Sequence, residues 1–232
     1  MENTDDSDTM LPTGIVTDEA KIRRYVNVDS LIKDGATLNE VDKDFKNSFK
    51  NWRCDLRLGN EVYISSESAP RQLKKGEFVT IHPGDFVLLL TKEHLKLPAN
   101  VMGFISMRFD YKEKGLINVS GFHVDPKYEG KLIFSAFNAG PKDIVLRESD
   151  PIFMIFFERM HFLEGEAPSK VKTGFEYIPA KMVEEIQGKS ATLSANANRL
   201  DRIEFYMKVM GGIIIASGLS FIGFGIKALI GA

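Results

Sequence analysis

The segment of this chain that could do chemistry is a loop, Gly121 to Gly130, which reads GFHVDPKYEG. Strand-forming residues flank it, from Leu116 to Val119 and from Lys131 to Phe137. A loop held between two strands presents fixed backbone N–H and C=O groups, and Asp125 adds a carboxylate acceptor. Such groups recognise the edge of a base and a sugar hydroxyl. The alternative is an ordinary hairpin in which Asp125 only closes the turn.

The elements that must position this loop are predicted to be strands. From Trp52 onward, glycine or proline turns recur roughly every 8 to 12 residues, which is typical of an all-β barrel or sandwich. Two apolar runs, Val87 to Leu90 and Ile152 to Phe157, predict strands buried on both faces, in a core or in a subunit contact. A helix is expected to begin near Glu19, capped by Thr17 or Asp18.

Four stretches of the chain resemble the dCTP deaminase and dUTPase superfamily of trimeric β-barrel enzymes, which act on pyrimidine deoxynucleoside triphosphates. They read GIVTDEAKIRRYV, CDLRLGN, IHPGDFVLLLT and VDPKYEGKLIFSAFNAG, and the resemblance spans about Gly14 to Phe157. It implies a mainly β fold, a distorted β-barrel or jelly roll with an N-terminal helix. It also implies a homotrimer whose sites lie between subunits and whose ligand is a deoxynucleotide or a related nucleotide.

The resemblance also implies which residues form the site. Asp125 takes the position of the aspartate that binds the deoxyribose 3′-hydroxyl, and Tyr128 that of the aromatic residue beside the sugar. Gly130 and Asn138 take structural positions of the same motif. A histidine bonded to local partners is the plainer interpretation of His123. The predicted nucleotide-binding residues are Arg108, Gly115, His123, Val124, Asp125 and Tyr128.

Departures from the family pattern argue against ordinary catalysis. Phe109 and Asp110 stand where the family has two phosphate-binding serines, and Asp110 adds a negative charge there. Ser135 stands where the deaminases have their proton-shuttling glutamate, and a hydroxyl cannot act as a base near neutral pH. Glu113 replaces an expected arginine. We therefore assign no catalytic residue, and the fold is expected to be kept while the chemistry is lost.

Three functions follow as alternatives. The first, which we favour, is a membrane-anchored pseudoenzyme that binds a deoxynucleotide or a related nucleotide as a sensor or effector, with anti-phage defence suggested by analogy alone. The second is an active dCTP deaminase or dUTPase in which Asp110, Glu113 or Asp125 has taken over. The third is a trimeric membrane scaffold with no small ligand. The sequence identifies no cofactor, and Mg²⁺ would enter with a nucleoside triphosphate by bridging carboxylates and phosphates.

Composition narrows these alternatives. The chain has 232 residues, 44% of them apolar and 27% charged, which fits one globular domain with appendages. A net charge of −2 with dispersed lysines and arginines gives no basic face for DNA or RNA. The single cysteine, Cys54, excludes a disulfide within the chain, indicates a reducing compartment and is expected to be a buried apolar residue.

The domain organisation follows from changes in character along the chain. Residues 1–13 read as a disordered acidic tail, 14–160 as the β domain and 161–178 as a linker. Residues 179–208 read as a helical stem resembling a coiled coil, because Ile186, Leu193, Leu200 and Met207 recur every seven residues. A lone helix packed on the barrel is the alternative for that stretch.

Residues 209–232 read as a transmembrane helix. Val209 to Ile226 contains 18 residues without a charge, and at ~1.5 Å per residue this nearly crosses a ~30 Å hydrocarbon core. Arg199, Arg202 and Lys208 precede it, so the positive-inside rule predicts a single-pass C-terminal anchor with a cytoplasmic globular domain. A buried core helix is the alternative interpretation.

Overall fold

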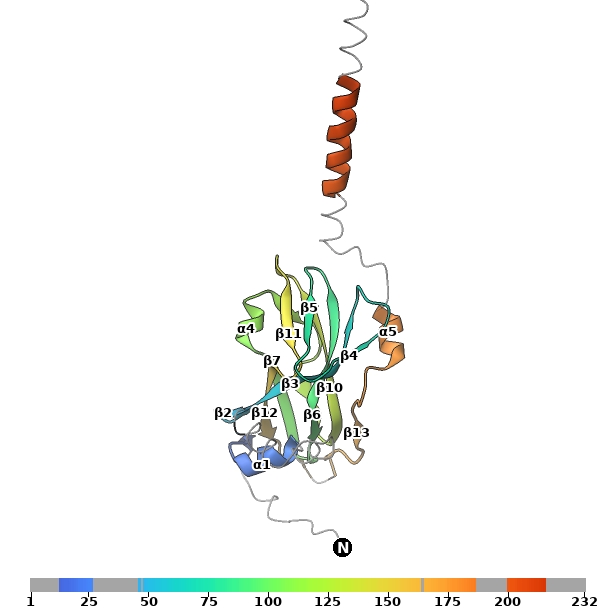
Figure 1. Cartoon of the computed structure of the whole chain (residues 1–232). Helices are drawn as coiled ribbons and strands as arrows, with labels where there is room; N and C mark the ends of the chain where they lie inside the picture. The colour runs from blue at the N-terminus through green and yellow to red at the C-terminus, as the bar shows by residue number, and fades with distance from the viewer. Residues whose placement is uncertain (1–12, 27–45, 47, 164, 187–199, 216–232) are drawn as a thin grey trace, which may run out of the picture. The chain divides into compact units, whose positions relative to one another are not determined.

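The computed structural model describes residues 13–26, 46, 48–163, 165–186 and 200–215 (Figure 1). The chain divides into two units, Met1–Ser190 and Ala191–Ala232. The disordered tail expected at residues 1–13 therefore lies, except for Thr13, outside the described residues.

One curled sheet forms the framework of the first unit, as the sequence predicts. Its main path runs in the order β13–β10–β6–β3–β12–β7–β9, and with β1, β2, β4 and β8 it has 11 strands among the described residues. β5 and β11 form a separate antiparallel pair. The strands are β1 (Gly14–Ile15), β2 (Phe49–Lys50), β3 (Arg53–Ile64), β4 (Arg71–Gln72), β5 (Phe78–Ile81), β6 (Phe86–Lys96), β7 (Val101–Met107), β8 (Leu116–Asn118), β9 (His123–Val124), β10 (Tyr128–Asn138), β11 (Ile144–Arg147), β12 (Pro151–Arg159) and β13 (Lys172–Thr173).

The long strand β3 joins the two halves of the sheet. Its first part pairs with β12, where Cys54 lies opposite Ile155, and its second part pairs with β6, where Tyr63 lies opposite Leu88. The register of the β3–β6 pairing shifts between Leu58 and Val62, and a Cβ at Gly59 would lie 2.8 Å from the Thr91 carbonyl oxygen. A residue without a side chain thus allows β3 to approach β6 as the sheet bends.

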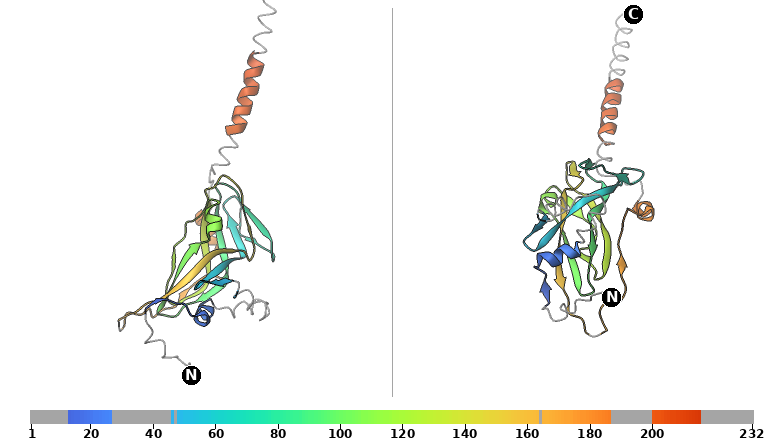
Figure 2. Two further views of the ribbon diagram at one scale, coloured as in Figure 1. Left: turned by 90° about the vertical axis from the view of Figure 1, so that its left-hand side faces the viewer. Right: turned by 60° about the horizontal axis from the view of Figure 1, so that its bottom comes forward.

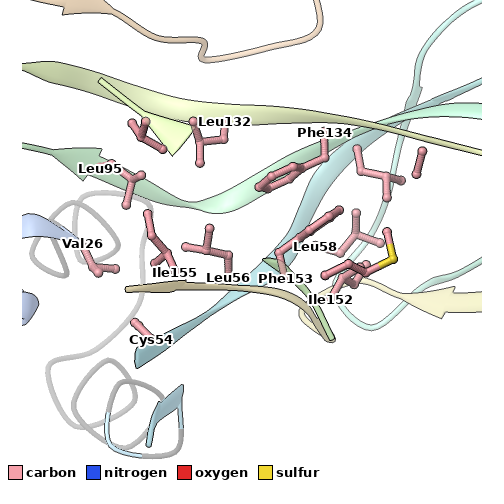
Figure 3. Packing of buried hydrophobic residues seen from close by; sticks show 14 of the residues in the cluster. Val26, Cys54, Leu56, Leu58, Leu95, Leu132, Phe134, Ile152, Phe153 and Ile155 are labelled. Atoms are coloured by element: carbon pink, nitrogen blue, oxygen red, sulfur yellow. The ribbon is translucent and has the colours of Figure 1, made fainter. Parts of the chain in front are cut away.

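The main core fills the space between the two halves of the sheet (Figure 3). Side chains of β10 and β6 point toward those of β3 and β12, and the Phe134 and Phe153 rings stack with their centroids 3.6 Å apart. Residues Val87 to Leu90 are all at most 2% exposed, which confirms that this run is buried on both faces. The other apolar run differs, because Met154 and Phe156 on β12 face outward and are only half-buried.

Among the described residues, short helices accompany the sheet at α1 (Glu19–Tyr25), α4 (Phe109–Lys112) and α5 (Ala180–Ile186). The predicted cap of α1 is confirmed, since the Asp18 carboxylate accepts a hydrogen bond from the Lys21 N–H at 3.0 Å. Tyr25 is buried and meets the Phe157 ring edge-on. Cys54 is buried as expected, and this burial raises the pKa of its thiol.

Residues 172–186, which we call the strap, cross the outer side of the sheet (orange in Figures 1 and 2). β13 adds to the edge of β10 in parallel, although residues 161–178 are expected to be a linker. Ile178 and Val183 of the strap form a second apolar cluster with Tyr63, Leu88 and Leu90. The apolar residues on the outer side of β6 are therefore covered by the strap.

The prediction of a membrane anchor is wrong. No helix within the described residues is long and apolar enough to cross a membrane. Residues 200–215 are helical and include four charged residues, Asp201, Arg202, Glu204 and Lys208. A span needs about 20 apolar residues. Residues 216–226 of the predicted span, and Leu193 of the predicted stem, lie outside the described residues.

The predicted localisation, a cytoplasmic domain anchored to the membrane, depended on this helix and is withdrawn. The alternative of a membrane scaffold loses its support for the same reason. Leu200 and Met207 of the predicted stem are exposed on the helical segment 200–215. The coiled-coil stem stays a prediction.

Candidate functional site

Asp125 lies at the tip of a tight turn that links β9 to β10. The Asp125 carbonyl accepts from the Tyr128 N–H at 3.3 Å, and Lys127 between them has a φ of 59°. The Asp125 side chain is 34% exposed. One carboxylate oxygen pairs with the Lys172 ammonium of the strap, and the other lies 3.3 Å from His123 Nε2.

The charge of Asp125 is stabilised by these neighbours. The hydrogen bond from Lys172 holds the pKa of the Asp125 carboxyl below its usual value, and His123 acts in the same direction. The carboxylate is thus ionised, partly exposed and fixed in position. Such a group can accept a hydrogen bond from a hydroxyl of a bound molecule.

Tyr128 begins β10 immediately after this turn and is buried. Its hydroxyl donates to the Lys131 carbonyl at 2.6 Å, and burial raises its pKa to about 12. Gly174 of the strap lies against the Tyr128 hydroxyl, where a Cβ would collide with it. The predicted contact between Tyr128 and a sugar stays a prediction.

His123 and Val124 form β9 and have different surroundings. The His123 side chain is 42% exposed and meets the Phe122 ring edge-on, whereas Val124 is buried in the main core. His123 is therefore placed to contact a ligand at Asp125. Val124 could contribute only its backbone.

Arg108 lies at the end of β7, where two carboxylates neutralise it. Its guanidinium donates to Asp55 at 2.7 Å and lies 3.4 Å from Asp110. Asp55 is buried, and the Arg108 side chain is 26% exposed. Sequence reasoning missed this pair, although an aspartate within the apolar strand CDLRLGN signals a cation nearby because a buried charge needs a partner.

Gly115 has a structural role within the chain. Its φ is 95°, and a Cβ there would lie 2.5 Å from the Gly140 Cα. The fully buried Asn138 fixes the same turn, because its side chain donates to the Ile81 and Lys142 carbonyls and accepts from the Gly140 N–H. A side chain at Gly115 would disrupt this turn.

Ser135 lies on the outward-facing side of β10 and is half-buried. Its carbonyl accepts from the Val119 N–H at 2.8 Å and from the Ser120 N–H at 3.3 Å. No carboxylate among the described residues hydrogen-bonds to the Ser135 hydroxyl.

The chain brings Asp125, His123 and Tyr128 together and adds Lys172, which the sequence did not indicate. It does not join them to Arg108, because no hydrogen bond or ion pair within the described residues links Arg108 to Asp125. The described residues also contain no group of three His, Cys, Asp or Glu side chains suited to a metal.

Together these features define a curled β-sheet protein with an ionised carboxylate on a loop between strands. Comparison with known proteins gives its family. The family model described as dCTP deaminase-like matches residues 27–160. A dCTP deaminase of Pyrococcus abyssi is 34% identical over 116 residues, which cover 50% of this chain and 70% of that protein. The chain belongs to the dCTP deaminase-like family.

Solved structures give weaker likenesses. A dCTP deaminase of Agrobacterium tumefaciens matches 66% of this chain and 50% of its own, with 19% identity and a TM-score of 0.48. A dUTPase of the S. aureus phage phi11, with a structural Mg(II) ion, matches 56% and 94% with 12% identity and a TM-score of 0.35. At these TM-scores the family assignment rests on the sequence matches. Neither the fold nor these relatives support the expected sensor or anti-phage role.

Proposed function

We propose that this protein binds a pyrimidine deoxynucleotide at Asp125 and turns over dCTP or dUTP slowly or not at all. The observation that carries the proposal is the state of Asp125. In a chain of the dCTP deaminase-like family, this carboxylate is ionised, partly exposed and held beside His123. It accepts a hydrogen bond from a sugar hydroxyl, at the position that the family resemblance implies.

Weak turnover follows from the groups that replace the family pattern. Ser135 provides a hydroxyl where deamination needs a base, and a positioned acid–base group typically supplies ~10² to 10⁴ in rate. Asp110 and Asp55 both pair with Arg108, so the charge of this arginine is compensated within the chain. A triphosphate would meet a carboxylate where the family offers hydroxyls.

A second candidate is an active dCTP deaminase, favoured by the 34% identity to a dCTP deaminase over 70% of that protein. It would need another base. The exposed Asp110, which stands at one of the two positions of the phosphate-binding serines, is a carboxylate that could take this role. Product analysis separates the two candidates, since only this one yields a deoxyuridine nucleotide from dCTP.

We propose further that the protein is a homotrimer. Support comes from an outward apolar face on β7 and β12, formed by Met102, Phe104, Met154 and Phe156. Phe104 stacks with Phe156 at 5.5 Å and with Phe122 at 6.4 Å, and Phe122 is 65% exposed. A cluster of half-buried and exposed aromatic rings on an outward face is typical of a subunit contact.

Light scattering of the full chain tests this assembly. We expect three times the mass of one chain for the wild type and a smaller mass for Phe104→Ser. Phe78→Ser is the control, because Phe78 is 62% exposed on the separate β5–β11 pair. A monomeric wild type at micromolar concentration would show the trimer proposal to be wrong.

A thermal-shift screen tests the binding proposal. The full chain is melted with each deoxynucleoside and ribonucleoside triphosphate over a concentration series. A ligand that binds only the folded state adds ~2.7 kcal/mol of stability at a hundred times its Kd. We expect Tm to rise with dCTP or dUTP. No rise with any pyrimidine deoxynucleotide would overturn the proposal.

A further inference from the structure

The strap is fastened to the turn that carries Asp125. The Lys172 N–H donates to the Lys127 carbonyl at 2.9 Å, and the Gly174 N–H donates to the Glu129 carbonyl at 2.7 Å. Phe175 and Lys131 exchange two further backbone hydrogen bonds, at 2.8 and 3.1 Å. The strap lies outside residues 27–160, which match the family model.

Two glycines set how closely the strap approaches β10. A Cβ at Gly130, whose φ is 144°, would lie 2.5 Å from the Gly174 Cα, and a Cβ at Gly174 would lie 2.8 Å from the Gly130 Cα. This backbone-to-backbone contact places Gly174 over the Tyr128 hydroxyl. Lys172 then reaches the Asp125 carboxylate.

The strap consequently covers the groups that a sugar would need. Lys172 pairs with one oxygen of Asp125 while His123 lies beside the other, and Gly174 covers Tyr128. A hydroxyl that approaches Asp125 must compete with the Lys172 ammonium. The Lys172 side chain is itself 62% exposed, so the ion pair is weak enough to be displaced.

The remainder of the strap is anchored separately. Glu61 accepts a hydrogen bond from the Ile178 N–H at 2.6 Å, and Val183 of α5 lies in the second apolar cluster. Lys172 to Tyr177 can therefore detach while α5 stays in place. Tyr177 is 66% exposed, whereas Phe175 packs against the second apolar cluster and Glu176 lies 3.3 Å from His94, so release of this segment must break these two contacts.

We infer that the strap is an autoinhibitory element, in which Lys172 occupies the Asp125 carboxylate and a nucleotide binds by displacing it. The inference rests on the proposed function. The free protein is then partly closed, and its apparent Kd equals the intrinsic Kd divided by the fraction of molecules with an open strap. Ligand binding releases the backbone hydrogen bonds of Gly174 and Phe175.

Calorimetric titration of the full chain with dCTP and dUTP tests the competition. Lys172→Met removes the ammonium, and we expect binding about two- to fivefold tighter, as loss of one exposed ion pair predicts. Lys172→Arg keeps a cation and should bind like the wild type. Lys170→Met is the matched control, because Lys170 is an exposed lysine two residues away and its loss should change nothing.

Hydrogen exchange of the strap gives a second readout, and its first arm needs no ligand. In the free protein, Lys172→Met should speed exchange at Gly174 and Phe175, and Lys170→Met should not. In the wild type, saturating nucleotide should speed the same exchange. Slower exchange with nucleotide would identify the strap as a lid that closes on the ligand and would overturn the inference.

The outcomes of the titration separate the two proposals. If wild type and Lys172→Met bind nucleotide with the same Kd, or if the variant binds more weakly, the inference is wrong and the proposed function stands. If neither protein binds dCTP or dUTP, the proposed function is wrong and the inference falls with it.

Discussion

Asp125→Ala should weaken nucleotide binding, and the structure sets the size of the effect. A hydrogen bond to a charged group contributes ~1.5 to 3 kcal/mol. The substitution also removes the ion pair between Asp125 and Lys172. A nucleotide no longer has to break this pair, which recovers ~0.2 to 1 kcal/mol of binding free energy. The lost hydrogen bond minus the recovered ion-pair energy is roughly 1.7 kcal/mol at the middle of the two ranges, which corresponds to about a twentyfold weaker Kd.

Titration calorimetry of the full chain with dCTP and dUTP measures this change. Asp143→Ala is a matched control, because Asp143 also pairs with a partly exposed histidine, His82 at 2.9 Å, on another loop. We expect the control to keep the wild-type Kd. If Asp125 only closes the turn, Asp125→Ala will lower Tm and leave the Kd of the folded fraction unchanged, and that result would refute the reasoning.

Three further predictions concern the fold, the chemistry and pH. Glu93→Ala leaves the buried Arg57 without the carboxylate that accepts from its Nε at 2.6 Å and from its backbone N–H at 2.7 Å, so chemical denaturation should show a loss of ~3 to 5 kcal/mol. Glu129→Ala, which breaks the exposed pair with Lys96, should lose less than ~1 kcal/mol, and equal losses would contradict this account. Ser135→Glu alone should not produce deoxyuridine nucleotide from dCTP, because the changes at Phe109 and Asp110 remain; a ~10²-fold gain would show that Ser135 is the missing group. The hydrogen bond to Asp143 raises the pKa of His82, so this pair stabilises the fold below the unfolded pKa of ~6.5, and its contribution is lost as pH rises through the folded pKa. NMR titration should show a lower His82 pKa in Asp143→Ala, and an unchanged value would exclude the pair as the cause.

Local sequence patterns predicted most of the fold. The cap at Asp18 and the doubly buried run Val87 to Leu90 depend on local chemistry and on apolar periodicity, and the structure has both. The membrane helix failed because hydrophobicity was counted over Val209 to Ile226 as one span.

The site was predicted only in part, because its remaining contacts join residues distant in sequence. The pairs Asp55–Arg108 and Asp125–Lys172 connect residues separated by 53 and 47 positions. The spacing of residues along the sequence does not predict contacts between such distant residues. The strap was read as a linker since its strand has two residues, and the contact between Gly130 and Gly174 is visible only in three dimensions.

The central claim, binding without efficient turnover, can be tested in one mixture. The full chain is equilibrated with dCTP and with dUTP, bound and free nucleotide are separated by dialysis, and both fractions are analysed by chromatography. We predict that nucleotide is bound in excess of the Asp125→Ala control and recovered chemically unchanged. Substantial conversion of dCTP to dUTP, or of dUTP to dUMP, or no bound nucleotide at all, would contradict the claim.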